Sequence, residues 1–255
     1  MRIATWNVNS LNVRLPQVLG WLAKHAPDIL CLQETKLEDG KFPAEDVQRA
    51  GYQALYSGQK TYNGVAILSR ELCQDAVSVI PEFDDGQKRV LAATVCGVRA
   101  ICVYVPNGEH VESDKYRYKL RWLQAVNAWL QHEMTRFPRL AVLGDFNIAP
   151  EPRDVHDPAV WEGQVLYSGP ERAAFGKLIA LGLTDAFRLF AQPPQSYTWW
   201  DYRLNAFRRR MGLRIDHILL SAELAARCRA CAIDAEPRRL ERPSDHAPVL
   251  ADLAP

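Results

Sequence analysis

The sequence predicts an α/β fold in which short strands and helices alternate along a single domain, residues 1–255. Eight short runs are rich in Val, Ile and Leu and are separated by Gly, Pro, Asn and Asp, as expected for strands between turns. Other segments carry apolar residues at the three- and four-residue spacing of an amphipathic helix. No Gly/Ser-rich linker, repeat or abrupt change of composition divides the chain, which favours one domain.

The predicted strands are distributed over the whole chain. They are Arg2–Val8, Asp28–Gln33, Gly64–Ser69, Arg89–Val95, Val98–Val105, Leu140–Phe146, Leu213–Leu220 and Pro248–Leu253. The fourth and fifth are separated only by Cys96 and Gly97, a spacing typical of a tight hairpin.

Three helices are predicted between these strands. The first carries an apolar stripe between Leu15 and Leu22, and a longer one extends from about Ser113 to Met134. The third begins at Pro170 and Glu171, because proline suits the first turn of a helix and an acid there is stabilised by the helix dipole.

Composition and charge are those of an ordinary globular protein. Hydrophobic residues make up 48% of the 255 residues, which argues against a disordered chain. Because 31 Lys and Arg nearly balance 30 Asp and Glu, any contact with a polyanion must come from locally arranged charge. The N-terminal segment has no signal-peptide pattern, and no run approaches the roughly 18 apolar residues of a membrane span. We therefore expect a cytoplasmic protein without a membrane partner, whose six cysteines stay reduced.

Polar and acidic residues stand at or near the ends of five predicted strands, where a core strand would carry apolar residues. They are Asn7, Asn9, Glu34, Asp145, Asn147, Asp216, Asp245 and His246. Taken singly, each has a plainer interpretation as a turn or cap residue. Together they indicate a compensating cation, because unpaired buried acids are costly. Since the donors are mostly oxygen atoms, the pattern favours Mg²⁺ or Mn²⁺ over zinc.

Seven motifs, in order along residues 2–253, resemble those of the exodeoxyribonuclease III family of the endonuclease/exonuclease/phosphatase superfamily. The motifs are WNVNS at 6–10, LQETK at 32–36, YVPNG at 104–108, GDFN at 144–147, TWWDYR at 198–203, RIDHIL at 214–219 and SDHAP at 244–248. The GDFN and SDHAP motifs alone would indicate only the superfamily, whereas LQETK, YVPNG and TWWDYR are far more specific to its DNA-repair branch. The resemblance implies a four-layer α-β-β-α sandwich of two packed mixed sheets, the DNase I-like fold, with the site across one edge.

The resemblance also implies roles for the residues at the strand ends. Glu34 would be the first ligand of one or two Mg²⁺ ions, with Mn²⁺ as a substitute, and the rest of the metal environment would be Asn7, Asp145, Asn147 and Asp245. Asp145 would act as general base on water, with Asn147 orienting it, and Tyr104 would contact the scissile phosphate. Asp216 would hold His246 and keep its imidazole protonated for phosphate binding.

A DNA-binding rim around these acids is implied as well. Its members would be Lys119, Trp199, Arg203, Arg208, Leu213 and Ile215. Arg203 and Arg208 belong to a basic run that continues to Arg214 without an acid. A solvated surface is the usual interpretation of such a run, but this one lies between TWWDYR and RIDHIL, where the family has a DNA-contacting loop, so the resemblance favours phosphate contact. Trp199, Leu213 and Ile215 would form an apolar pocket for a flipped baseless sugar, or else ordinary core. His217 should be a packing residue, because it points away from Asp216 on a strand.

The activity implied is that of a Mg²⁺-dependent DNA-repair phosphodiesterase. It comprises a 3′-to-5′ exonuclease on double-stranded DNA, a 3′-end phosphatase or phosphodiesterase, and an apurinic/apyrimidinic endonuclease cutting 5′ to abasic sites. The partner would be double-stranded DNA with abasic sites or 3′ ends, and we expect a monomer. One alternative is a member restricted to 3′-end processing, with the segment Glu151–Gly169 obstructing an internal abasic site. Another is a superfamily phosphatase on lipid or inositol headgroups, against which TWWDYR and the basic run argue.

Overall fold

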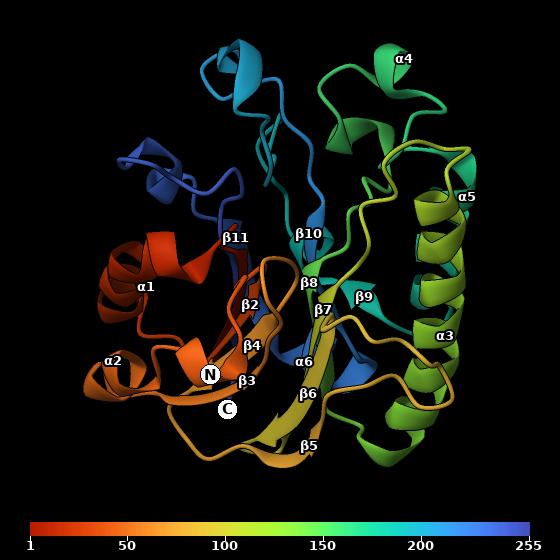
Figure 1. The fold of residues 1–255 in the computed structure, drawn as a ribbon. Helices are drawn as coiled ribbons and strands as arrows, with labels where there is room; N and C mark the ends of the chain where they lie inside the picture. Colours follow the sequence, from red (N-terminus) through yellow and green to blue (C-terminus); the bar gives the residue numbers. More distant parts are fainter.

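Two six-stranded sheets form the centre of the computed structural model, which describes residues 1–255 (Figure 1). The first sheet has the order β11 (Cys228–Ile233), β12 (Val249–Leu253), β1 (Arg2–Asn7), β2 (Ile29–Gln33), β4 (Val65–Ser69) and β3 (Gln53–Ser57). The second has the order β5 (Gln74–Val77), β6 (Val90–Val95), β7 (Val98–Tyr104), β8 (Leu140–Asp145), β10 (Asp216–Leu220) and β9 (Thr184–Asp185). Each sheet contains one parallel pair, β1 with β2 and β7 with β8, among antiparallel neighbours, so both sheets are mixed.

The sheets pack face to face, and their central strands are buried on both sides. Strand β7 illustrates the pattern: Ala100 and Cys102 belong to the cluster between the sheets, whereas Ile101 and Val103 belong to the cluster beneath the helices. Successive side chains of a strand point to opposite faces, so a strand buried on both faces needs a continuous apolar run. This is why the central strands could be predicted as uninterrupted Val, Ile, Leu and Ala segments.

Helices cover the outer face of each sheet and complete the four layers. Helices α1 (Leu11–His25) and α2 (Ala44–Arg49) pack on the first sheet, and α3 (Asp114–Arg136) and α5 (Gly169–Ala180) pack on the second. The short helices α4 (Pro158–Trp161) and α6 (Ala222–Arg227) lie in connecting segments. The predicted four-layer sandwich is therefore confirmed. None of these helices combines the length and the apolar character that crossing a membrane requires.

The differences from the predicted elements are the sheet edges, one strand start and the short helices α2, α4 and α6, which were not predicted. Strands β3, β5, β9 and β11 were not predicted, because edge strands such as β5, with three exposed residues of four, lack an apolar pattern. The predicted strand Leu213–Leu220 begins only at Asp216. Leu213 instead forms isolated bridges with Val155 and Trp199, which draw the chain away from the sheet.

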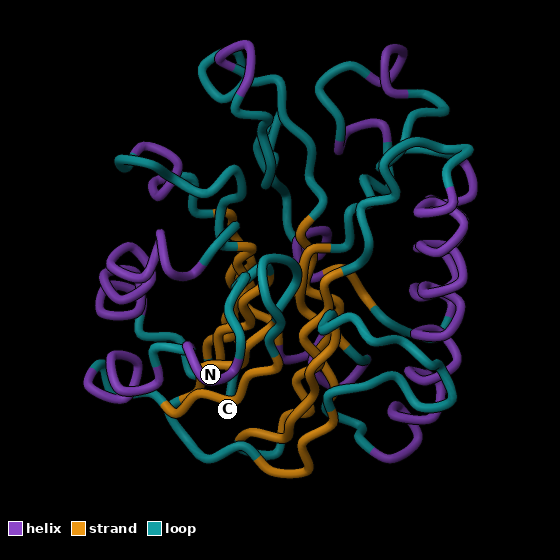
Figure 2. The backbone as a smooth tube through the Cα atoms, viewed as in Figure 1, coloured by secondary structure: helices purple, strands orange, loops and turns teal.

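Long loops extend from one end of the sandwich and carry most of the irregular structure (Figure 2). The chain leaves three strands in the left-handed conformation, with φ of 43° at Asn9, 52° at Glu34 and 50° at Asn147. Strict alternation would direct Glu34 to the helix side with Leu30 and Leu32. The turn at Glu34 instead allows its side chain to join the residues between the sheets. Strand alternation alone therefore cannot place these side chains.

Candidate active site and metal centre

Strand register places three polar side chains next to one another at one end of the inner strands β7, β8 and β10 of the second sheet. Tyr104 is the register partner of Asp145, and Asp145 is the partner of Asp216. All three occupy positions in phase with residues of the inter-sheet core, such as Cys102 and Leu143, so their side chains point toward the other sheet. The site is thus the polar end of the inter-sheet core.

Asn7, at the end of β1 in the first sheet, bridges the two carboxylates of the site. Its Nδ2 atom donates hydrogen bonds of 2.9 Å to Glu34 Oε1 and of 2.9 Å to Asp145 Oδ2. Its Oδ1 atom accepts from the Asn9 amide at 3.0 Å. Asn7 therefore presents a donor to the acids, and its predicted part in the metal environment remains a prediction.

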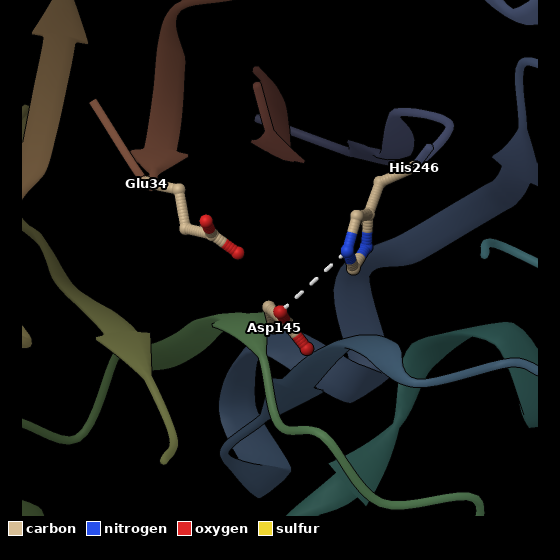
Figure 3. A group of neighbouring side chains, drawn as sticks. All are labelled: Glu34, Asp145 and His246. Carbon is tan, nitrogen blue, oxygen red and sulfur yellow. Dashed lines mark ion pairs between the residues drawn. The ribbon is translucent and has the colours of Figure 1, made fainter. Parts of the chain in front are cut away.

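Glu34, Asp145 and His246 converge on one small space, although they lie on distant parts of the chain (Figure 3). Each offers a potential ligand atom, and these atoms lie within 4.8 Å of one another. The His246 Nε2 atom is 3.8 Å from Asp145 Oδ2. Such a group can hold a metal ion. His246 can be one of the ligands only if its imidazole is not protonated.

Asp216 keeps His246 protonated. Its Oδ2 atom lies 2.9 Å from Nδ1 of the imidazole, and both side chains are buried. Burial alone would lower the pKa of His246, but the carboxylates of Asp216, Asp145 and Asp245 outweigh it and raise that pKa to about 10. A protonated imidazole cannot ligate a metal, so the remaining donors are the oxygens of Glu34 and Asp145. That donor set fits a hard cation such as Mg²⁺ or Mn²⁺.

Asp145 combines near-complete burial with hydrogen bonds to both of its oxygens. Its pKa is raised to about 7, first by burial and then by Asp216, against the lowering influence of His246 and of the Asn7 hydrogen bond. Asn147 donates to it twice, from its backbone N at 2.9 Å and from Nδ2 at 3.2 Å. An ionisable carboxylate with a pKa near neutrality is suited to accept a proton from water.

The roles predicted for two neighbouring residues, Tyr104 and Asp245, remain predictions. The Tyr104 hydroxyl is held protonated, because burial and the Glu34 carboxylate raise its pKa well above the usual value. Asp245 lies outside the converging group: its carboxylate accepts hydrogen bonds of 2.9 Å from Asn9 Nδ2 and of 2.9 Å from Trp199 Nε1. Asp245 thus orients an aromatic side chain beside the site.

Two basic residues expected to face DNA are buried instead. Lys119 is 0% exposed and pairs with Glu171 of α5, so its predicted DNA contact is corrected. Arg214 is 1% exposed, with Nε 2.6 Å from Asp154 Oδ1 and Nη2 2.8 Å from Asp185 Oδ2. Lys119 and Glu171 are 52 residues apart in sequence, and Arg214 and Asp154 are 60 residues apart. A local charge pattern therefore could not reveal these pairs.

The three residues of the predicted apolar pocket belong to one packed apolar cluster. Leu213 and Ile215 are at most 1% exposed and pack with Leu166 and Val155, while only Trp199 is partly exposed. Leu213 and Ile215 are therefore core residues here, the alternative that the sequence left open, and their contact with DNA remains a prediction. Leu166 was not singled out by sequence analysis, because only its backbone conformation, with φ of 77°, sets it apart.

His217 is a packing residue, as predicted. It lies on the helix side of β10 between Phe146 and Phe175. Its Nδ1 atom is 2.9 Å from Arg214 Nη1, and because arginine can only donate, this nitrogen accepts. Nε2 therefore carries the proton and donates to the Ile148 carbonyl at 2.9 Å. Burial and Arg214 lower the pKa of His217 to about 3, so the ring stays neutral.

The exposed part of the basic run remains available at the surface. Arg208, Arg209 and Arg210 are exposed, and none forms a hydrogen bond or ion pair through its side chain. Arg203 is exposed as well, but it pairs with Asp201 at 2.8 Å. The loop between Trp199 and Leu213, which extends beyond the sheets (Figure 1), thus carries three exposed positive charges that no acid of the protein pairs with.

Comparison with known proteins is consistent with this arrangement. The model of the endonuclease/exonuclease/phosphatase family matches residues 4–246. Exodeoxyribonuclease III of Haemophilus influenzae is 33% identical over 266 aligned positions, covering 99% of this chain and 100% of that protein. The chain belongs to the exodeoxyribonuclease III family. It is accordingly a hydrolase of the exodeoxyribonuclease and AP endonuclease type, in a family of DNA-repair nucleases.

Two solved structures are similar over nearly the whole chain. A 3′ phosphatase from Neisseria, bound to a product DNA hairpin, is 52% identical with a TM-score of 0.98, covering 99% of each chain. An AP endonuclease from Archaeoglobus fulgidus is 41% identical with a TM-score of 0.95, again covering 99% of each chain. The fold is therefore that of this nuclease family throughout, and the two relatives differ in the substrates for which they are named.

Proposed function

We propose that the protein hydrolyses phosphate esters at the 3′ ends of double-stranded DNA, as a Mg²⁺-dependent exonuclease and 3′ phosphatase. The proposal rests on the buried Asp145 carboxylate. Its ligand atom and those of Glu34 and the protonated His246 all lie within 4.8 Å of one another. Phosphate ester hydrolysis needs a proton acceptor for water and positive charge beside the phosphate. This arrangement supplies both groups in one preorganised site.

Mg²⁺ would be held by the oxygens of Glu34 and Asp145. The ion supplies Lewis-acid stabilisation of the charge that develops on the phosphate and on the leaving oxygen. The buried Oδ1 atom of Asp216 has no hydrogen-bond partner, so the site has acceptor capacity beyond what the protein uses. The all-oxygen donor set supports Mg²⁺ or Mn²⁺ over zinc.

The protein's own residues divide the remaining work. Asp145 accepts the proton of the attacking water, and Asn147 holds both carboxylate oxygens so that they keep one orientation. His246, charged at neutral pH, donates a hydrogen bond from Nε2 to a phosphate oxygen. Tyr104 stays protonated and provides a second donor from the neighbouring strand. The exposed Arg208–Arg210 run binds phosphates of the DNA backbone.

Incision 5′ to an abasic site is the second candidate activity, and the name of the Archaeoglobus fulgidus relative supports it. An abasic sugar needs an apolar recess next to the scissile phosphate. Here Leu166 belongs to the same packed apolar cluster as Leu213 and Ile215, and its backbone, in a left-handed conformation, is hydrogen-bonded to Ala149 and Glu171. This packing favours 3′-end processing over abasic incision.

The test uses three labelled duplexes that carry a 3′ hydroxyl, a 3′ phosphate or an internal abasic analogue, each with Mg²⁺ and with EDTA. We expect Mg²⁺-dependent shortening and phosphate release on the first two and weak incision of the third. Leu166→Gly should raise abasic incision at least about tenfold relative to 3′ phosphatase activity, because it opens the recess and relieves the positive φ. Absence of turnover on all three duplexes would refute the proposed function. Equal turnover on all three would establish the second candidate activity.

A further inference from the structure

Lys119 is a fully buried cation whose hydrogen bonds all point to segments that form the site. Its ammonium has three N–H donors and three partners: the Glu171 carboxylate, the Asn107 carbonyl at 3.0 Å and the Asn147 carbonyl at 2.7 Å. Every donor is used inside the protein. Contact with DNA would require breaking a buried ion pair, which makes a direct phosphate contact unfavourable.

Glu171 completes the arrangement from the other side. Oε1, which pairs with Lys119, also accepts from the Leu166 backbone N at 3.0 Å, and Oε2 accepts from the Ser168 backbone N at 3.0 Å and from its hydroxyl. The pair thus ties together three segments: the YVPNG segment at the end of β7, the GDFN segment at the end of β8, and the turn before α5 that carries Leu166.

Asn147 transmits this anchoring to the proton acceptor. Its carbonyl is held by Lys119, its side-chain Oδ1 accepts from Asn107 Nδ2 at 3.1 Å, and its left-handed backbone has φ of 50°. From this fixed position its backbone N and Nδ2 donate to the two oxygens of Asp145. A chain of hydrogen bonds therefore leads from the buried pair to the carboxylate that reacts.

We propose that Lys119 and Glu171 form a positioning pair that fixes Asp145 for proton transfer through Asn147. The inference deepens the proposed function and rests on it, because it assigns how the proton acceptor is held. Burying two charges is costly, and a buried ion pair can often be replaced by apolar residues without loss of stability. Here the pair holds each site segment at a defined position, so its removal should act on the catalytic step more than on folding.

The same helix carries a second buried pair that serves as a matched control. Arg99 Nε lies 2.7 Å from Glu133 Oε2, and the side chains are 1% and 4% exposed. Arg99 also donates to the Asp75 carbonyl, far from the site segments. Both pairs link α3 to another element, but only the pair of Lys119 reaches Asn147.

The experiment compares K119M, the double variant K119M/E171Q and the control R99M/E133Q. The measurements are kcat and KM on a 3′-phosphate duplex, the melting temperature, and hydrogen exchange at the Asn147 amide. We expect kcat of K119M and of the double variant to fall about 100-fold with KM within about threefold, because a small misplacement costs this much. The double variant should melt at a higher temperature than K119M, since it leaves no unpaired charge. The control should keep its kcat and its Asn147 protection.

The possible outcomes separate the inference from its alternatives. A double variant with wild-type kcat and Asn147 protection would reduce the pair to a structural role and overturn the inference. A raised KM at constant kcat would restore Lys119 as a DNA contact, and equal losses in the control would point to general destabilisation; either result overturns it. Inactive wild-type protein would refute the proposed function. Even then, loss of hydrogen-exchange protection at the Asn147 amide in the Lys119 variants alone would support the anchoring of Asn147 by the buried pair.

Discussion

Replacing Asp216 by Asn removes the carboxylate that pairs with His246 while almost preserving the shape of the side chain. Asp216 Oδ2 and His246 Nδ1 are 2.9 Å apart, and both side chains are at most 5% exposed. Burial opposes the charge on His246, so the imidazole stays protonated only because carboxylates surround it. Without Asp216, the remaining carboxylates of Asp145 and Asp245 should no longer outweigh burial. We expect a neutral ring at pH 7.5.

Two magnitudes bear on the strength of the interaction between Asp216 and His246. Coulomb's law at an effective dielectric constant of about 20 gives about 6 kcal/mol for unit charges at the observed separation. The rise of the pKa of His246 from 6.5 to about 10 corresponds to about 5 kcal/mol, which is the net effect of Asp216, Asp145 and Asp245 together against burial. Breaking one partner of a buried pair usually costs about 3–5 kcal/mol. We therefore expect D216N to lower the free energy of unfolding by about 3–5 kcal/mol at pH 6.5.

The sign of the pH dependence follows from the raised pKa. Stability from a group whose folded pKa is raised is fully present below its unfolded pKa, here 6.5, and is lost as the pH rises through the folded pKa of about 10. The difference in unfolding free energy between wild type and D216N should thus shrink between pH 6.5 and pH 10. The value of kcat/KM at pH 7.5 should fall about 10²–10³-fold, as for loss of one preorganised donor to the phosphate.

The assay combines ¹³C NMR titration of the histidine rings from pH 5 to 11 with urea unfolding at pH 6.5 and 9.5. His217, whose pKa is lowered to about 3 by burial and Arg214, should stay neutral in both proteins and serves as internal control. If His246 titrated at the same pH in both proteins, or if the stability difference were independent of pH, the assignment of the Asp216–His246 pair would be wrong.

Three further predictions test the metal ligand, the proton acceptor and the DNA rim. Measured by calorimetry, Glu34→Gln should bind Mg²⁺ about tenfold or more weakly than the wild type, whereas Glu38→Gln should bind it as the wild type does. Equal Mg²⁺ affinities of the two variants would exclude Glu34 as a ligand. Asp145→Asn should lower kcat at least about 10³-fold with DNA affinity within threefold, so near-normal turnover would rule out Asp145 as base. Arg208→Gln should reduce the slope of log K for DNA against log salt by about 1, whereas Arg49→Gln on α2 should not; an unchanged slope would remove Arg208 from the rim.

The local pattern of the sequence determined the strands, the helices and the polar residues at the strand ends. Buried strands such as β7 and β8 must carry continuous apolar runs, so an acid such as Asp145 at the end of one stands out. The seven motifs were sufficient to indicate the family, because LQETK, YVPNG and TWWDYR are specific to its DNA-repair branch and all seven occur in order along the chain. Edge strands escaped prediction, since an exposed strand such as β5 needs no apolar pattern.

Only the tertiary structure decided which charged residues are exposed and which pair inside the protein. Lys119 and Arg214 look in the sequence like members of basic runs, yet their acids Glu171 and Asp154 come from distant segments, so both cations are buried. The protonation of His246 likewise depends on carboxylates brought together from several loops and strands. Charge type is local information, whereas burial and pairing depend on contacts between remote segments, and these contacts form only when the two sheets pack.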